Sequence, residues 1–337
     1  MFAKNRKRVL ALGAVVTACV ALLVVWATVP VGATPMSADD ALAAVGTPHI
    51  LKVHHVGDAV PGAGVPLTYH GKGKVMQAQE ISYAIFWEPS NLQNGNATQV
   101  SPTYNSLLKQ YFGDVGGNGL YNNNTQYYQV VSGTKKFIIN KSSFGGAWVD
   151  TSAYPASGCS DSATPGNCVT DLQIQAEVAK AISTKGWSAG LTHMFFVFTS
   201  KGEGSCFDGS STTCAFTDYC AYHNYYTNVS GHPVIYANMP YTGTSLAGCG
   251  VSKSPNNDFD ADSTINVTSH EQMEAVTDPR LNAWYESSGA EIGDKCAWNF
   301  GTLSFDGGKA NENWNGHFYI LQQEWDNSTG GCVQARP

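Results

Sequence analysis

The sequence has few charged residues and no basic segment beyond its N-terminus. Charged residues make up 13% of its 337 positions, and the formal net charge is −7. A nucleic-acid groove needs clustered Lys and Arg, so this composition excludes one. No internal repeat is visible, and the length allows one large domain or two small ones.

The cysteines lack the CxxC spacing that is typical of zinc-binding thiolates. An N-terminal segment that resembles an export signal contains Cys19, and eight cysteines follow it. An even number of cysteines in an exported chain predicts disulfides. Sequence alone leaves the connectivity open. Proximity and chain order suggest Cys159–Cys168, Cys206–Cys214, Cys220–Cys249 and Cys296–Cys332.

The export signal is predicted from charge and hydropathy. Four basic residues precede an apolar run from Val9 to Val29, and small residues end at Ala33. This order is typical of a secretory signal that is cleaved near Thr34. The run is also long enough to span a bilayer, so an uncleaved membrane anchor stays open as an alternative.

The pattern of apolar segments predicts an α+β domain with several strands. Strands are expected over 81–89, 136–140, 192–200, 232–241, 290–298 and 317–332. Residues 192–200 are apolar on both faces, which predicts a central strand. Residues 203–224 are interpreted as a cysteine-rich loop.

Three helices are expected. The first covers 101–112, with Ser101 as N-cap and Gly113 as its end. The second covers 169–187, with an apolar face of Leu172, Ala176, Ala179 and Ile182. The third begins at Asp262 or Ser263 and ends before Pro279.

This third helix contains the motif "HEQME", which has the form HExxE rather than the HExxH of zinc peptidases. Residues four apart lie on one helix face, so His270 and Glu274 could bind one ion. Glu271 is turned about 100° away, where a general base for a metal-bound water belongs. Because imidazole is the better zinc donor, the missing second histidine weakens this interpretation.

Zinc needs a third protein ligand, and "EIGD" at 291–294 supplies two candidates. If this segment is a strand, Glu291 and Asp294 point to opposite faces. We expect Asp294 to be the ligand, because Gly293 beside it would let the backbone approach closely.

A simpler interpretation is that His270 and Glu274 form an ordinary i,i+4 pair on a solvated helix. The other histidines have similar alternatives. His223 is interpreted as structural with a minor prospect of touching a metal, and His317 as a surface residue or an oxyanion donor. His49 is expected to be solvated within an N-terminal arm, with loose metal binding as the alternative.

Three segments resemble the phosphate-induced, EXORDIUM-like secreted proteins, including their bacterial members. They are "VTDPRLNAWY", the loop with "CAYH", and the terminal "QQEWDNSTGGC", and the likeness extends from about residue 75 to 332. The resemblance implies an extracellular or wall-associated protein, with a link to growth signalling in plants. Plant members have "TNP" where this chain has "TDP" at 277–279, and they lack the His-Glu pair. That departure favours an active, zincin-like bacterial member.

Together these observations predict a disulfide-stabilised α+β protein with a zincin-like mixed sheet and an active-site helix. Residues 1–33 would be a signal peptide or anchor, 34–75 a linker or pro-like arm, and 76–337 one catalytic domain. The expected function is zinc-dependent hydrolysis of a peptide or protein, which could be a cell-wall component. The strand at 234–239 is expected to align the substrate. Alternatives are a non-catalytic surface-binding protein, or a metal site that only stiffens the fold.

Overall fold

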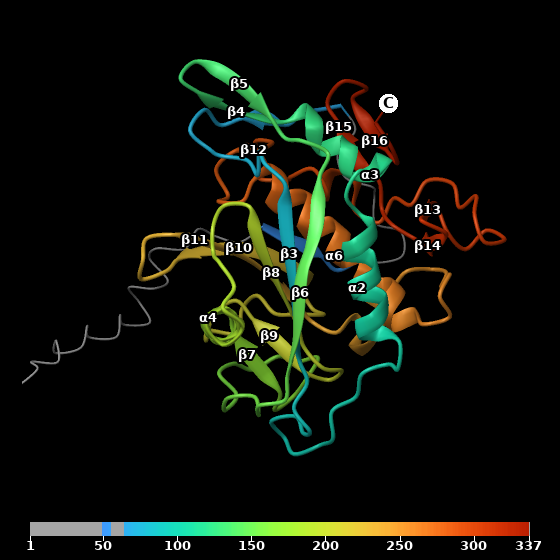
Figure 1. Cartoon of the computed structure of the whole chain (residues 1–337). Coiled ribbons are helices and arrows are strands. Elements are labelled where there is room, and N and C mark those ends of the chain that lie inside the picture. The colour runs from blue at the N-terminus through green and yellow to red at the C-terminus, as the bar shows by residue number, and fades with distance from the viewer. Residues whose placement is uncertain (1–48, 55–63, 337) are drawn as a thin grey trace, which may run out of the picture. The chain divides into compact units, whose positions relative to one another are not determined.

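The computed structural model describes residues 49–54 and 64–336 (Figure 1). Contacts place all the described residues in one compact unit. The expected signal segment and its cleavage near Thr34 lie outside the described residues. Among those that are described, no helix has the length and apolar character needed to cross a membrane.

The described part of the chain contains a six-stranded mixed sheet, which confirms the expected α+β class. The first three strands in its order are antiparallel neighbours, and the remaining pairs are parallel. The order is β1 (His49–Lys52), β10 (Tyr219–Thr227), β11 (Pro233–Met239), β8 (His193–Phe198), β3 (Glu80–Trp87) and β6 (Ser142–Asp150).

The centre of this sheet agrees with the hydropathy of its strands. In β8, five consecutive residues from Met194 to Phe198 are buried, and the strand pairs with β11 on one side and β3 on the other. A strand with neighbours on both sides and helices above both faces has no solvent-facing side. The predicted central strand is therefore confirmed.

Helices cover both faces of the sheet (Figure 1). In β10, the Tyr222 hydroxyl donates to Asp171 of α4 (Asp171–Lys185), while His223 faces α6 (Phe259–Thr277). Adjacent strand residues point to opposite faces, so α4 and α6 lie on opposite sides. A third helix, α2 (Tyr104–Asp114), contacts α6, β3 and β6.

Helix α4 buries a different stripe from the predicted one. Its buried apolar residues are Ile174, Val178 and Ala181, whereas Ala176 and Ala179 are exposed. The hydroxyls of two sheet tyrosines donate to Asp171 in the first turn of the helix. This tertiary contact fixes the rotation of the helix about its axis. The pattern of apolar residues within the helix cannot predict that contact.

Helix α6 begins one turn before the predicted start. Asp258 is its N-cap, and its carboxylate accepts the Ala261 N–H at 3.1 Å. The hydroxyls of Ser101 and Thr103 donate to the same carboxylate at 2.7 and 2.6 Å, so Ser101 does not cap α2 as predicted. The predicted end of α6 before Pro279 is confirmed.

The cysteine-rich segment is more regular than expected. Residues 204–206 form β9, which pairs with β7 (Cys168–Thr170), and β10 begins at Tyr219. The prediction of a loop over 203–224 was therefore wrong for the part that carries His223.

The C-terminal third contains short hairpins, and the predicted strand at 290–298 is a turn with the 3-10 helix η3 (Asp294–Cys296). The predicted strand at 136–140 is limited to the end of β5. The small antiparallel pairs are β2 (Thr68–Tyr69) with β12 (Trp284–Tyr285), β4 (Tyr128–Val131) with β5 (Thr134–Phe137), β13 (Glu312–Trp314) with β14 (His317–Tyr319), and β15 (Glu324–Asp326) with β16 (Gly331–Val333). The short helices are α3 (Gly119–Asn122), η1 (Asn123–Gln126), η2 (Thr242–Thr244) and α5 (Leu246–Cys249).

All four expected disulfides are confirmed. Cys220–Cys249 ties β10 to α5, and Cys296–Cys332 ties η3 to the last hairpin. Both cross-linked segments contribute residues to the site described below. Cross-links of this kind limit the conformational freedom of the unfolded chain and typically stabilise the folded state by about 2–4 kcal/mol each.

Glu80 of β3 is buried against α6 and gives the fold a specific pH dependence. Its carboxyl group accepts hydrogen bonds from Ser82 at 2.6 Å and Gln272 at 2.9 Å, and from Ser142. Burial outweighs these bonds and raises the pKa of Glu80 to about 7. The folded state therefore retains a proton that the unfolded state releases near pH 4.5.

We expect Glu80→Gln to stabilise the protein increasingly as pH rises from about 4.5 to about 7. In this window the folded state keeps the Glu80 proton and the unfolded state has released it, so rising pH favours unfolding of the wild type, by about 3 kcal/mol at most. Urea unfolding at several pH values measures the difference. The control is Glu286→Gln, whose difference should stay flat because the pKa of Glu286 is lowered. A flat difference for Glu80→Gln would contradict the assignment.

Candidate metal centre

The structure brings the three predicted ligands together. His270 Nε2 lies 3.1 Å from Glu274 Oε1 and 3.7 Å from Asp294 Oδ1. One ligand atom from each residue lies within 4.8 Å of the other two. His270 and Glu274 are fully buried on successive turns of α6, and Asp294 begins η3 with 21% of its side chain exposed. Asp294 is thus the member of this group nearest to solvent.

Gly293 allows the turn to approach the helix. A Cβ atom at this position would lie 2.6 Å from His270 Nδ1 and 3.1 Å from Glu274 Oε1. The Asp294 N–H donates to Glu274 Oε1 at 2.9 Å, and the Glu291 N–H donates to Asp294 Oδ2 at 3.1 Å. These bonds hold the turn so that its carboxylate faces the helix.

Gln322 controls which nitrogen of His270 is free. Its Nε2 donates to the Gly293 carbonyl at 2.9 Å and lies 2.9 Å from His270 Nδ1. With this nitrogen toward a neutral ring, Nδ1 accepts and Nε2 carries the proton, whereas a charged His270 needs the Gln322 oxygen there to accept from Nδ1. A metal at Nε2 requires the reverse, with the Gln322 amide turned so that its oxygen accepts from Nδ1.

A second group of possible ligands lies beside the first. His223 Nε2 is 3.5 Å from Glu291 Oε2, and His223 Nδ1 is 3.7 Å from Glu274 Oε2. One atom each from His223, Glu274 and Glu291 again lies within 4.8 Å of the others. The two groups share Glu274. His49 of β1 adds a third imidazole, with Nδ1 3.1 Å from Glu291 Oε1.

Glu271, the predicted base, lies against His223. The distance from its Oε2 to His223 Nδ1 is 3.4 Å. Its other oxygen, Oε1, is buried and has no hydrogen-bond partner in the described part of the chain. Glu271 therefore lies beside the ligands and keeps one oxygen free.

Most of the polar atoms in this cluster lack partners. Among the residues that the structure describes, Glu274 Oε2, His223 Nε2 and both carboxylate oxygens of Glu291 make no hydrogen bond, and Glu291 Oε1 has only the contact with His49. Leaving a buried charged group unsatisfied costs several kcal/mol, so native proteins rarely do so. Converging unsatisfied donors of this kind fit a bound cation.

The pKa shifts of these residues also reflect how closely the buried acids and imidazoles are packed together. Burial disfavours charge on His270, but Glu274, Glu271 and Asp294 outweigh it and raise the pKa of His270 to about 10. Burial likewise opposes charge on Glu274, yet His270, His223 and His49 lower its pKa to about 2. His270 and Glu274 therefore form an ion pair in the protein without metal.

The remaining acids of the cluster bind their protons more tightly than usual in that state. Burial and the charge on Glu274 raise the pKa of Glu291 well above its usual range, and burial does the same for Glu271. Burial lowers the pKa of His223. A divalent cation would replace these protons, so its binding would release them.

The donor set fits zinc. One imidazole and two carboxylates are zinc ligands, and three protein ligands leave a fourth coordination position, as in catalytic zinc sites. A further group formed by Cys159, Cys168 and Cys206 offers no thiolate, because all three sulfurs are in disulfides.

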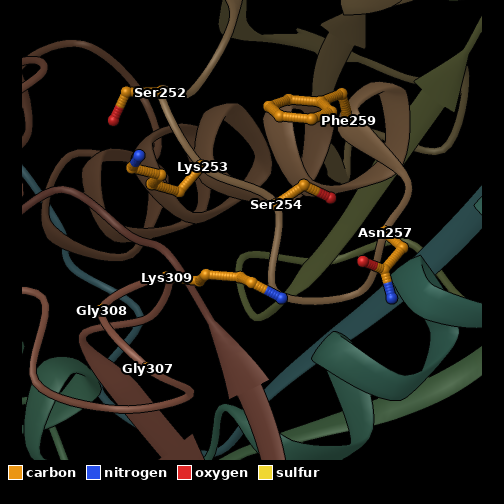
Figure 2. A pocket seen from close by; sticks show the side chains of 8 residues that line it. All are labelled: Ser252, Lys253, Ser254, Asn257, Phe259, Gly307, Gly308 and Lys309. Atoms are coloured by element: carbon orange, nitrogen blue, oxygen red, sulfur yellow. The ribbon is translucent and has the colours of Figure 1, made fainter.

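Other candidate features lie elsewhere. His317 Nδ1 bonds Asp114 Oδ2 at 2.6 Å, which places it outside the cluster. A surface pocket of about 590 Å³ lies near the start of α6, and Figure 2 shows Lys253, Ser254 and Lys309 around it. None of the cluster residues lines this pocket.

Sequence reasoning underrated His49, His223 and Glu291 as members of the site. His49 is not solvated as expected, since only 19% of its side chain is exposed and it pairs with Glu291. Glu291 was set aside on strand alternation, but a turn at 290–293 followed by η3 lets both carboxylates face α6. The run "YCAYHNYY" was a usable signal for His223, because it is rich in strand-forming tyrosines.

Comparisons with known proteins give one partial likeness. Over 96 residues the chain is 35% identical to "Protein EXORDIUM-like 3" of Arabidopsis thaliana, a stretch that covers 24% of this chain and 28% of the plant protein. No protein-family model and no solved structure matches the chain. The partial match supports the expected resemblance to EXORDIUM-like proteins at most, and it leaves the zincin-like fold a proposal.

Proposed function

We propose that the protein is a secreted peptidase whose zinc ion is held by His270, Glu274 and Asp294. The observation that supports it best is Glu271, a fully buried carboxyl group beside these ligands with one oxygen free of hydrogen bonds to any described residue. A purely structural ion has no use for such a group, whereas hydrolysis needs a base there. The zincin-like architecture belongs to the same proposal.

In this proposal zinc, when bound, would supply a Lewis acid that polarises the reacting groups. Glu271 would take a proton from the attacking water and pass it to the leaving amine. His223, 3.4 Å away through Nδ1, would orient the Glu271 carboxylate. Gln322, in its turned orientation, would hold the ring of His270 through Nδ1.

The predicted substrate-aligning strand does not fit this role. Residues 234–239 belong to β11, whose two edges are both occupied, by β10 and by β8. A peptide adds only to a free strand edge. Strand β10 carries His223 of the cluster, but it lies between β11 and β1 and therefore has no free edge either.

Access to the cluster is therefore the main requirement of the peptidase proposal. His223, His270, Glu271, Glu274 and Glu291 are all fully buried. Strand β1 lies over them, since His49 pairs with His223 in the strand register and contacts Glu291. A peptide would reach Glu271 after β1 leaves the β10 edge, which matches the expected pro-like arm.

We expect cleavage of the chain between residues 55 and 63 to increase peptidase activity. A protease site engineered there would cut the connection between β1 and the domain. A short linker holds its ends at an effective concentration on the order of millimolar, and this advantage disappears after cutting and dilution. Activity on a quenched fluorescent peptide library, measured before and after cutting at micromolar protein, tests the expectation.

The control for this experiment carries Glu271→Gln in addition to the engineered site. It should be cut equally well and stay inactive. If the cut chain releases residues before the cut and gains no activity, β1 is not what limits access.

A second candidate function is a non-catalytic, EXORDIUM-like extracellular or cell-surface protein with a structural metal site. The complete burial of His223, His270 and Glu274 favours this alternative. Here the metal would only join α6 to β10 and η3. Substitution of Glu271 distinguishes the two functions, because a structural site does not depend on a base.

A further inference from the structure

The group His223, Glu274 and Glu291 is not used as a metal site by the proposed peptidase. We propose that it is a second site for a divalent transition-metal ion, and that Glu274 bridges this site and the His270 site. The proposal rests on the proposed function only in so far as Glu274 is also a ligand of the first ion.

The geometry of Glu274 carries the proposal. Its Oε1 faces His270 Nε2 at 3.1 Å, while its Oε2 faces His223 Nδ1 at 3.7 Å. The two oxygens of one carboxylate thus point at two different imidazoles. Carboxylates that bridge paired ions have this arrangement, and such ions typically lie about 3.5–4 Å apart.

The unsatisfied atoms of the second group are independent of the first. Among residues 49–54 and 64–336, neither His223 Nε2 nor either oxygen of Glu291 makes a hydrogen bond, and Glu291 Oε1 has only the 3.1 Å contact with His49 Nδ1. Both side chains are fully buried. His223 has Glu291 Oε2 3.5 Å from its Nε2 and Glu274 Oε2 3.7 Å from its Nδ1. One ligand atom from each of the three side chains lies within 4.8 Å of the others, so the three can surround one ion.

The carboxyl groups of the cluster could also balance the charge of two ions. Four acidic side chains, those of Glu271, Glu274, Glu291 and Asp294, lie in or beside the two groups. Ionised, they would carry four negative charges, which two divalent ions would balance. With a single ion, protons would have to balance the remaining carboxylates.

The donor types limit the ion. One imidazole with two carboxylates suits Zn²⁺, Mn²⁺ or Co²⁺, whereas Ca²⁺ takes six to eight oxygen ligands. The test therefore uses Zn²⁺ as the probe. The full chain is purified, stripped of metal, loaded with zinc, freed of excess zinc and analysed for zinc per chain.

We expect two zinc ions per wild-type chain, one in Glu291→Gln, and none in Glu274→Ala. Glu291→Gln preserves the shape of the side chain, so its loss of one ion would not come from misfolding. His223→Ala should also retain one ion. The matched control is His317→Ala, a histidine outside the cluster, which should bind two. Near-ultraviolet circular dichroism confirms that each variant is folded.

The possible failures separate the two proposals. One zinc in the wild type, unchanged in Glu291→Gln and His223→Ala, would overturn the second site and leave the peptidase proposal intact. Two zinc ions in Glu291→Gln would also overturn it. No zinc in the wild type would overturn both proposals. A wild type with two ions, but without peptidase activity before or after the cut at 55–63, would support the second site and count against the proposed function.

Discussion

Glu271→Gln is expected to lower the turnover of peptide substrates by about 10² or more and to leave the zinc content unchanged. Glutamine has the size and shape of glutamate but cannot accept the proton of the attacking water. A positioned general base typically contributes 10² to 10⁴ in rate. Glu271 contributes no atom to either ligand group, so both ions should remain bound. Turnover and zinc per chain are measured on the same cut preparation.

Two further variants serve as controls for this result. Glu88→Gln changes a glutamate outside the cluster and should leave turnover unaltered. His270→Ala removes a ligand of the first site only, so it should lose activity and one of the two zinc ions. If Glu271→Gln keeps full turnover, Glu271 is not the base. If no activity is found in any preparation and zinc remains bound, the non-catalytic alternative takes the place of the peptidase.

The parts of the fold that could be predicted depend on short-range patterns. The core strands β3 and β8 are continuous apolar segments, and their buried positions follow from that composition. The end of α6 follows from Pro279, since the residue before proline avoids helical geometry. The disulfides followed chain order because each bridge joins neighbouring cysteines in the sequence.

The errors occurred where long-range contacts decide the structure. The buried stripe of α4 is fixed by tyrosines from β10 and β11 that bond Asp171. Strand β10 mixes tyrosine, histidine and asparagine, a pattern that resembles a polar loop until its neighbours β1 and β11 supply the pairing. Contacts of this kind leave no periodic trace in the segment itself.

Some residues of the candidate site could likewise be predicted from short-range patterns, and others could not. His270, Glu271 and Glu274 could be grouped from helix geometry alone, and Gly293 indicated that the turn approaches closely. His49 could not be found by such reasoning. It reaches the cluster because β1 pairs with β10 in a register that sets His49 opposite His223, 174 positions later in the chain. The prediction that Glu291 and Asp294 point to opposite faces was wrong, because the segment is a turn and not a strand.

Removal of metal is expected to lower the melting temperature of the protein by roughly 10 °C or more. A ligand present at about 1,000 times its dissociation constant stabilises the folded state by about 4 kcal/mol per site. For a domain of about this size each kcal/mol corresponds to about 2–4 °C. The ions would also connect three elements, since the ligands come from α6, β10 and the segment at 291–294.

Thermal unfolding of the zinc-loaded chain and of the same chain after dialysis against a chelator measures this shift. Glu271→Gln should show the full shift, because it retains both ligand groups. Glu274→Ala should show none, because it lacks the shared ligand and has no ion to lose. Glu291→Gln should show a shift about half as large if the two sites contribute equally. Equal melting temperatures with and without chelator in the wild type would mean that protons alone balance the buried carboxyl groups, with His270 and Glu274 as an ion pair.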